Sequence, residues 1–224
     1  MRVLIACEES QAVTKAFREL GHEAFSCDIL PCSGGHPEWH YQQSVFEVID
    51  KGWDLMIAHP PCTYLAVSGA TWMYNKDGSR NEERYRNQME GLEFVHQLMN
   101  ADIPRIAIEN PISVISSYIR EPDQIIQPYF FGDTFRKTTC LWLKNLPHLE
   151  PTNMVEPEIV TYGGKTYSGA AGKWFKSAEE RRTERSKTFP GIAQAMAQQW
   201  GNEERLKKVG QQKSIFDEIQ DATM

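Results

Sequence analysis

Two short segments of the chain combine residue types that can do covalent chemistry. His59-Pro60-Pro61-Cys62 places a thiol directly after two prolines, which fix the backbone before it. A thiol becomes a nucleophile when neighbouring groups lower its pKa, and His59, Arg136 or a nearby helix end could do so here. Taken alone, the Pro-Pro-Cys motif also fits a rigid turn with an idle thiol.

The second segment, Glu109-Asn110-Pro111, adds a carboxyl group. A carboxyl group beside a thiol nucleophile permits a specific chemistry on pyrimidines. The thiolate adds to carbon 6 of the ring while the acid contacts the ring nitrogen and the exocyclic amine. Carbon 5 then becomes a nucleophile that can accept a methyl group.

Both segments follow apolar, β-prone runs, at 53–58 and 103–108, and two similar runs occur at 2–7 and 23–27. Further strands are predicted at 129–131 and 138–143, and helices at 10–20, 45–49, 81–100, 112–119 and 191–200. Strands alternating with helices predict an α/β fold, a mostly parallel sheet with helices on both faces. The functional residues should lie at the carboxyl ends of its strands.

The first predicted turn, Cys7-Glu8-Glu9-Ser10, lacks the glycines of a dinucleotide-binding turn. Its two carboxylates would repel a pyrophosphate, so this edge suits a cationic ligand such as S-adenosylmethionine better than NAD or ATP. Alternatively, Glu8 and Glu9 only cap the helix. Asp28, at the next strand end, could bind ribose hydroxyls or cap a turn.

The same segments resemble the motifs of cytosine-5 DNA methyltransferases. Ile57-Ala58-His59-Pro60-Pro61-Cys62 is similar to their Pro-Cys motif, and Ala107-Ile108-Glu109-Asn110-Pro111 to their Glu-Asn-Val motif. Phe135-Arg136-Lys137-Thr138-Thr139 falls where their Gln-x-Arg-x-Arg motif would lie, and the segment 189–197 resembles their closing motif. The order along the chain also matches. The resemblance implies a Rossmann-like class I S-adenosylmethionine-dependent methyltransferase fold in one domain, 1–202, with a polar tail, 203–224.

The resemblance also implies roles for individual residues. Cys62 would be the nucleophile, Glu109 the acid on the base, and Arg136 a supporting contact. The residues that would bind the cofactor S-adenosylmethionine are Cys7, Glu8, Glu9, Asp28, Ile29, His59 and Pro60. The residues that would bind the substrate are Pro61, Asn110, Lys137, Lys173 and Arg182. The implied enzyme transfers a methyl group to carbon 5 of cytosine in DNA through a covalent Cys62 adduct.

The sequence departs from the family pattern in several places. The first turn lacks Phe-x-Gly-x-Gly, Asn-Val is Asn-Pro, and Thr139 replaces the second arginine. The family has a target-recognition domain before the closing motif, whereas only a reduced loop region, 144–187, is available here. Recognition is then relaxed, or the substrate is a single strand, a free nucleotide, or DNA presented by a partner or a second copy in a homodimer. Such compactness suits a phage or mobile-element origin.

Two segments could hold a duplex or single-stranded DNA. Residues 163–187 carry seven Lys or Arg against three Glu, with aromatic residues between them, although a solvated loop and polar helix would look the same. The loop 64–80 offers wedge and phosphate-binding side chains for a flipped base, or forms a lid; these are Trp72, Met73, Tyr74, Lys76 and Arg80.

Composition limits the classes of protein to which the chain can belong. The chain of 224 residues has a net charge of −6, so contacts with nucleic acid must be local. No apolar run is long enough for a membrane span, and the N-terminus turns acidic too early for a signal peptide. The five cysteines form no paired framework, which predicts a cytoplasmic protein, in the bacterial host if phage-encoded.

Three other interpretations compete. Cys32, His36, His40, His59 and Cys62 are soft metal ligands, but their spacing fits no common zinc module, so no metal is expected. The chain could instead modify free dCMP or dCTP. It could also be a binding module for nucleic acid or nucleotides that keeps the fold without turnover.

Overall fold

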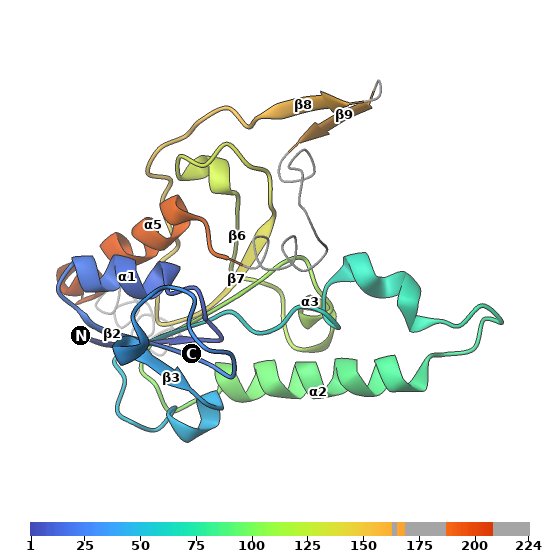
Figure 1. Cartoon of the computed structure of the whole chain (residues 1–224), viewed down its shortest axis with the longest axis horizontal. Helices are drawn as coiled ribbons and strands as arrows, with labels where there is room; N and C mark the ends of the chain where they lie inside the picture. The colour runs from blue at the N-terminus through green and yellow to red at the C-terminus, as the bar shows by residue number, and fades with distance from the viewer. Residues whose placement is uncertain (163–164, 169–186, 208–224) are drawn as a thin grey trace, which may run out of the picture.

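The computed structural model describes residues 1–162, 165–168 and 187–207. Its main sheet has seven strands in the order β3-β2-β1-β4-β5-β7-β6 (Figure 1). Their bounds are β1 Arg2–Ala6, β2 Glu23–Asp28, β3 His40–Gln42, β4 Leu55–Ala58, β5 Ile106–Asn110, β6 Gln124–Ile126 and β7 Thr139–Lys144. The pairings among β1 to β5 are parallel, whereas β7 runs antiparallel to both β5 and β6. The predicted α/β fold with a largely parallel sheet is confirmed, with an antiparallel edge added.

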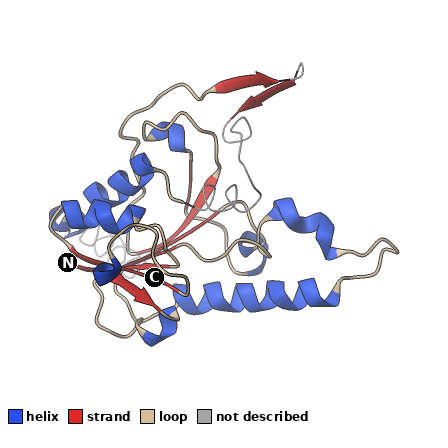
Figure 2. Ribbon diagram, viewed as in Figure 1, coloured by secondary structure: helices blue, strands red, loops and turns tan. Residues whose placement is uncertain are grey.

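Helices cover both faces of the sheet, also as predicted (Figure 2). α1 (Ala12–Glu19) and α5 (Pro190–Trp200) pack together on one face, and α2 (Glu82–Met99) lies on the other. Alternate residues of β1 serve the two faces, because Val3 and Ile5 join the α1 and α5 core while Leu4 and Ala6 join the α2 core. Burial on both faces explains why the strands are continuous apolar runs.

The shorter elements differ more from the predictions. The predicted helix 112–119 is the single turn α3 (Ile115–Tyr118), and 45–49 forms a 3-10 turn, η2 (Val45–Glu47). β4 and β5 begin a few residues later than predicted, at Leu55 and Ile106. Trp53 lies before β4, where its indole nitrogen donates to the carbonyl oxygen of Val48, 2.8 Å away.

The predicted strand 129–131 is wrong. These aromatic residues lie in the 3-10 turn η4 (Pro128–Phe130) and the residue after it. Pro128 begins the turn because its ring presets the backbone dihedral that such a turn needs. The edge strand is β6, five residues earlier along the chain, which pairs with β7.

Two segments project from the body. β8 (Ile159–Tyr162) and β9 (Lys165–Ser168) form an antiparallel hairpin where the sequence predicted a loop. Residues 63–81, here called the η3 arm, contain η3 (Val67–Met73) and lead into α2 at the opposite end of the molecule from α5 (Figure 1). In the described part of the chain, no helix has both the length and the hydropathy of a membrane span.

Candidate functional site

The register of the sheet brings the predicted residues into one row. Ala6 of β1 pairs with Ala58 of β4, which in turn pairs with Ile108 of β5. The next residues along these strands are Cys7, His59 and Glu109, and Asp28 ends β2 beside Cys7. The strand order reverses between β1 and β4, which is where open α/β sheets bind ligands.

Two contacts join the segment that follows β4 to the last two residues of β5. His59 Nδ1 lies 3.2 Å from Glu109 Oε2, and the two side chains are only 9% and 15% exposed. Asn110 Nδ2 donates to the carbonyl oxygen of Pro60 at 2.8 Å. Both pairs continue the β4–β5 register, so the backbone pairing itself places the acid beside the Pro-Pro-Cys segment.

The surroundings of Glu109 favour its ionised form. Burial alone would raise the pKa of this carboxyl, but the hydrogen bond from His59 and the charge of Lys137 outweigh it, with smaller help from Thr139. The pKa of Glu109 therefore lies below its usual range. The charge of Glu109 in turn adds to burial in raising the pKa of the Cys140 thiol.

Cys62 lies on the exposed loop after β4. Its carbonyl oxygen accepts hydrogen bonds from the backbone nitrogens of Leu65 and Ala66, at 3.0 and 2.9 Å. Leu65 and Val67 then pair with the loop after β5, through Val114 and Ile112. The thiol is therefore carried on a loop that is tied to the segment bearing Glu109.

Several buried polar atoms at this edge have no partner among the described residues. They include His59 Nε2 after β4, Asn110 Oδ1 at the end of β5 and Ser113 Oγ after it. A buried unpaired polar atom costs about 1–3 kcal/mol, so such atoms are rare in folded proteins. Their concentration here points to a polar ligand that completes them.

Glu8 caps helix α1, which was the alternative to its predicted cofactor contact. Its carboxylate accepts from the backbone nitrogen of Val13 at 2.6 Å and from the Thr14 hydroxyl at 2.7 Å. Burial raises the pKa of Glu8, although the charge of His59 and these hydrogen bonds act in the opposite sense. The preceding residue, Cys7, has a φ of 59°, a conformation that costs energy outside glycine and often marks functional sites.

The end of β2 combines polar and apolar groups. Asp28 Oδ1 accepts from the backbone nitrogen of Leu30 at 2.9 Å, and Ile29 is 74% exposed. Glu9 contacts Ser33 through both its backbone and its side chain. Exposed Ile29 and Leu30 beside a carboxylate present an apolar surface and a hydrogen-bond acceptor together, one strand away from the switch point of the sheet.

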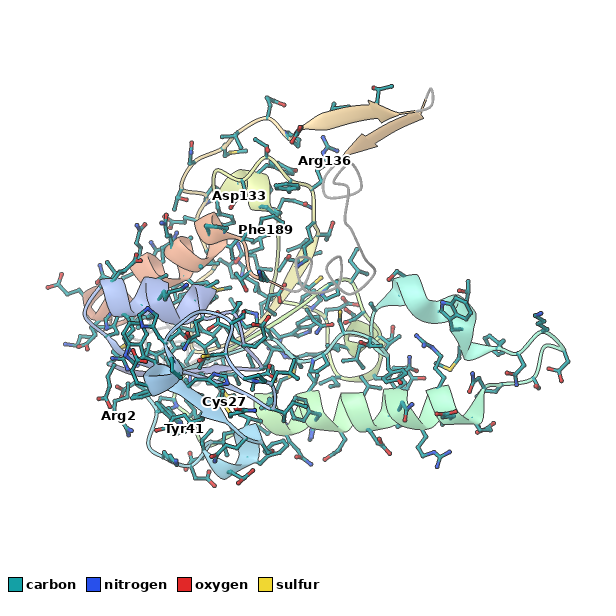
Figure 3. All side chains as sticks on the ribbon, in the orientation of Figure 1. Arg2, Cys27, Tyr41, Asp133, Arg136 and Phe189 are labelled. Carbon is teal, nitrogen blue, oxygen red and sulfur yellow. The ribbon has the colours of Figure 1, made fainter. Side chains whose placement is uncertain are left out.

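The structure places Arg136 and Lys137 on different sides of their loop. Arg136 is exposed and lies over the Tyr129 ring, 5.9 Å from its centroid, in the region shown in Figure 3. Lys137 and Thr139 face Glu109 instead. Side chains alternate in an extended segment, and this period of two could have separated Arg136 from Lys137 in the sequence. The predicted residues Lys173 and Arg182 lie outside the described residues.

The residues considered as metal ligands have other partners. His40 contacts Ser26 Oγ and the Leu30 carbonyl oxygen, and the His36 ring stacks on Trp39 at 3.7 Å between centroids. Within residues 1–162, 165–168 and 187–207, no group of three or more His, Cys, Asp or Glu could hold a metal ion.

Comparison with known proteins gives only distant structural likeness. The sequence matches no protein-family model, and no curated protein is similar to it. An E. coli prophage protein, provisionally described as a DNA modification methyltransferase, aligns with 70% of this chain and 52% of its own, at 13% identity and a TM-score of 0.42. The S. pombe Dnmt2 methyltransferase aligns with 66% of this chain and 50% of its own, at 13% identity and a TM-score of 0.40. The chain thus spans about half the length of these structures.

The buried Glu8 carboxyl should make stability depend on pH. A carboxyl whose pKa is raised in the folded state stabilises most below its unfolded pKa, and that contribution is lost as pH rises through the folded value. The free energy of unfolding of the wild type minus that of Glu8→Gln should therefore fall between pH 4 and 8, measured by urea unfolding. Glu19→Gln, exposed at the other end of α1, is the matched control. A difference that stays constant or rises with pH contradicts this prediction.

Proposed function

We propose that the chain is an S-adenosylmethionine-dependent methyltransferase that methylates carbon 5 of cytosine in DNA through a covalent bond to Cys62. The observation that carries this proposal is the joining of two neighbouring segments by the His59–Glu109 and Pro60–Asn110 contacts. These contacts hold a thiol-bearing loop and a carboxyl group together at the switch point of the sheet. Thiol and acid are the two groups that the reaction on a pyrimidine needs.

The residues near the switch point fit the proposed cofactor. The carboxylate of Asp28 suits ribose hydroxyls, and exposed Ile29 offers an apolar surface to an adenine ring. Cys7 and Glu9 lie on the adjoining turn, where acidic groups favour a cationic ligand over a phosphate. Glu8 would position this turn through the helix start rather than contact the ligand. S-adenosylmethionine, when bound, supplies a methyl group on a positively charged sulfur.

In the proposed reaction, the Cys62 thiolate adds to carbon 6 of cytosine, and ring nitrogen 3 takes a proton from the Glu109 side. Carbon 5 then carries the electron pair that accepts the methyl group. The carbon 5 proton is then lost to solvent, and the carbon–sulfur bond breaks. The proton on ring nitrogen 3 returns to the Glu109 side, and the methylated base and the free thiolate are released. Asn110, through Pro60, fixes the loop on which Cys62 is carried.

The η3 arm supports a nucleic-acid substrate rather than a free nucleotide. Trp72 and Tyr74 are 70% and 63% exposed on this arm, which continues directly from the Cys62 loop. Its cations are Lys76, which is exposed beside Asp77, and Arg80, which pairs with Glu82 at 2.9 Å. Exposed aromatic rings stack on unpaired bases without sequence preference, and cations contact phosphates.

Replacement of the proposed nucleophile should abolish methyl transfer. Cys62→Ser, incubated with S-adenosylmethionine and a cytosine-containing oligonucleotide, should form no detectable 5-methylcytosine by mass spectrometry of the digested nucleosides, because an alcohol is a much weaker nucleophile. It should still bind S-adenosylmethionine in calorimetry. Cys32→Ser, which removes a thiol that has no role in the proposed reaction, is the control and should keep wild-type activity. Full activity in Cys62→Ser would exclude the covalent mechanism, and methylation of dCMP alone would select the nucleotide enzyme.

Removal of the exposed Trp72 indole should weaken binding of DNA and no other property of the protein. Trp72→Ala should lower affinity for single-stranded DNA by about fivefold to 150-fold, which corresponds to stacking of about 1–3 kcal/mol per base. Fluorescence anisotropy with a labelled oligonucleotide measures the change. Met154→Ala is the control, because Met154 is similarly exposed at 68% but lies away from the arm. Equal affinity of Trp72→Ala and wild type would show that the arm does not hold the substrate.

A further inference from the structure

His59 joins three strands at the candidate site. Its backbone nitrogen donates to the Ala6 carbonyl oxygen of β1 at 2.9 Å, while its ring contacts Glu109 at the end of β5. The ring is 9% exposed, and its second nitrogen, Nε2, is buried without a partner among the described residues. The imidazole is therefore fixed at the centre of the row Cys7, His59, Glu109.

The contact between His59 and Glu109 holds a proton whatever the charges of the two groups. A hydrogen bond between an imidazole nitrogen and a carboxyl oxygen needs one hydrogen between them, because neither lone pair donates. When Nδ1 carries the hydrogen it donates to the carboxylate oxygen, and when Nδ1 carries none a protonated carboxyl donates to it. At 3.2 Å the pair can pass this hydrogen between its two atoms.

Other groups around the pair keep the proton off the carboxyl. Lys137 and Thr139 face Glu109 from the β6–β7 side, and together with His59 they lower its pKa. Glu8 also lies near His59, in the turn after β1, where burial raises the pKa of its carboxyl. Cys140 of β7 also lies near Glu109, as a thiol whose pKa is raised.

We infer that His59 is a positioning residue that orients Glu109 and stores the proton which Glu109 passes to ring nitrogen 3 of the cytosine. This inference rests on the proposed methyltransferase function. The step starts from an imidazolium, with a hydrogen on each ring nitrogen of His59, and a Glu109 carboxylate. As Cys62 adds to carbon 6, the Nδ1 proton moves to Glu109 while Glu109 protonates the ring nitrogen, and His59 is left as a neutral imidazole with its hydrogen on Nε2. After methyl transfer the carbon 5 proton leaves to solvent, and the nitrogen proton returns through Glu109 to His59. No proton is gained or lost by the pair over the cycle.

His59→Asn separates the two parts of this role, because its amide can still donate to Glu109 but cannot hold an extra proton. We expect kcat to fall by at least about tenfold, with KM for the oligonucleotide and binding of S-adenosylmethionine unchanged. The alkaline limb of the kcat profile should also move to lower pH, since a carboxyl loses its proton at lower pH than an imidazole does. His36→Asn is the matched control, because His36 forms a similar pair with Glu38 at 3.0 Å away from the site.

The outcomes separate this inference from the proposed function. Two results would overturn the role of His59 and leave the proposed methyltransferase function standing. One is a kcat of His59→Asn within about twofold of the wild-type value. The other is a lower kcat whose alkaline limb stays at the same pH as in the wild type. A wild type that forms no 5-methylcytosine overturns the proposed function. Carboxyl NMR supplies a readout without turnover: His59→Asn should raise the pKa of Glu109, because the charge of His59 that lowers it is lost while the amide keeps the hydrogen bond. An unchanged Glu109 titration contradicts the pair itself.

Discussion

The parallel pairing of β4 with β1 on one side and β5 on the other is the constraint on which the candidate site depends. This pairing sets Ala6, Ala58 and Ile108 in one register, and the residues that follow inherit it. A slip of one residue would turn His59 toward the opposite face of the sheet and separate it from Glu109. The apolar residues of the three strands resist such a slip, because they are buried against helices on both faces.

The candidate site also contains buried polar atoms that cost folding free energy. The rest of the interior consists mainly of aliphatic residues, whereas His59, Asn110 and Ser113 bury polar atoms without partners in the described chain. Cys7 adds a left-handed backbone conformation at the same edge. Such departures from local preference also occur singly at Arg84, Gln127 and Asn145, but here they gather at one edge of the sheet, as they do in a binding or catalytic site.

The sequence predicted the central strands and the row of polar residues well, because each strand is an apolar run that stops at a polar residue. Glu23–Asp28 and the segments ending in His59 and Glu109 are examples. The edge strand of the sheet was harder to predict from the sequence. Aromatic residues at 129–131 have high strand propensity, but Pro128 and the packing of the rings favour a turn.

Side-chain directions could not be predicted from composition or motif alone. Glu8 looks equally suited to a ligand and to a helix start, and only the positions of Val13 and Thr14 show that it binds the helix. Arg136 drew attention through its place in a motif, yet Lys137 is the cation that faces Glu109. The partner of His59 depends on register between strands far apart in sequence, which no local pattern contains.

Covalent trapping tests the central claim, that Cys62 adds to cytosine at this site, most directly. In an oligonucleotide containing 5-fluorocytosine, carbon 5 carries no proton to lose after methylation, so the bond to sulfur cannot break. Incubation with S-adenosylmethionine should yield a protein–DNA adduct, and peptide mapping by mass spectrometry should place it on Cys62. The account is contradicted if the wild type turns over ordinary cytosine but forms no adduct, or if the adduct maps to another residue.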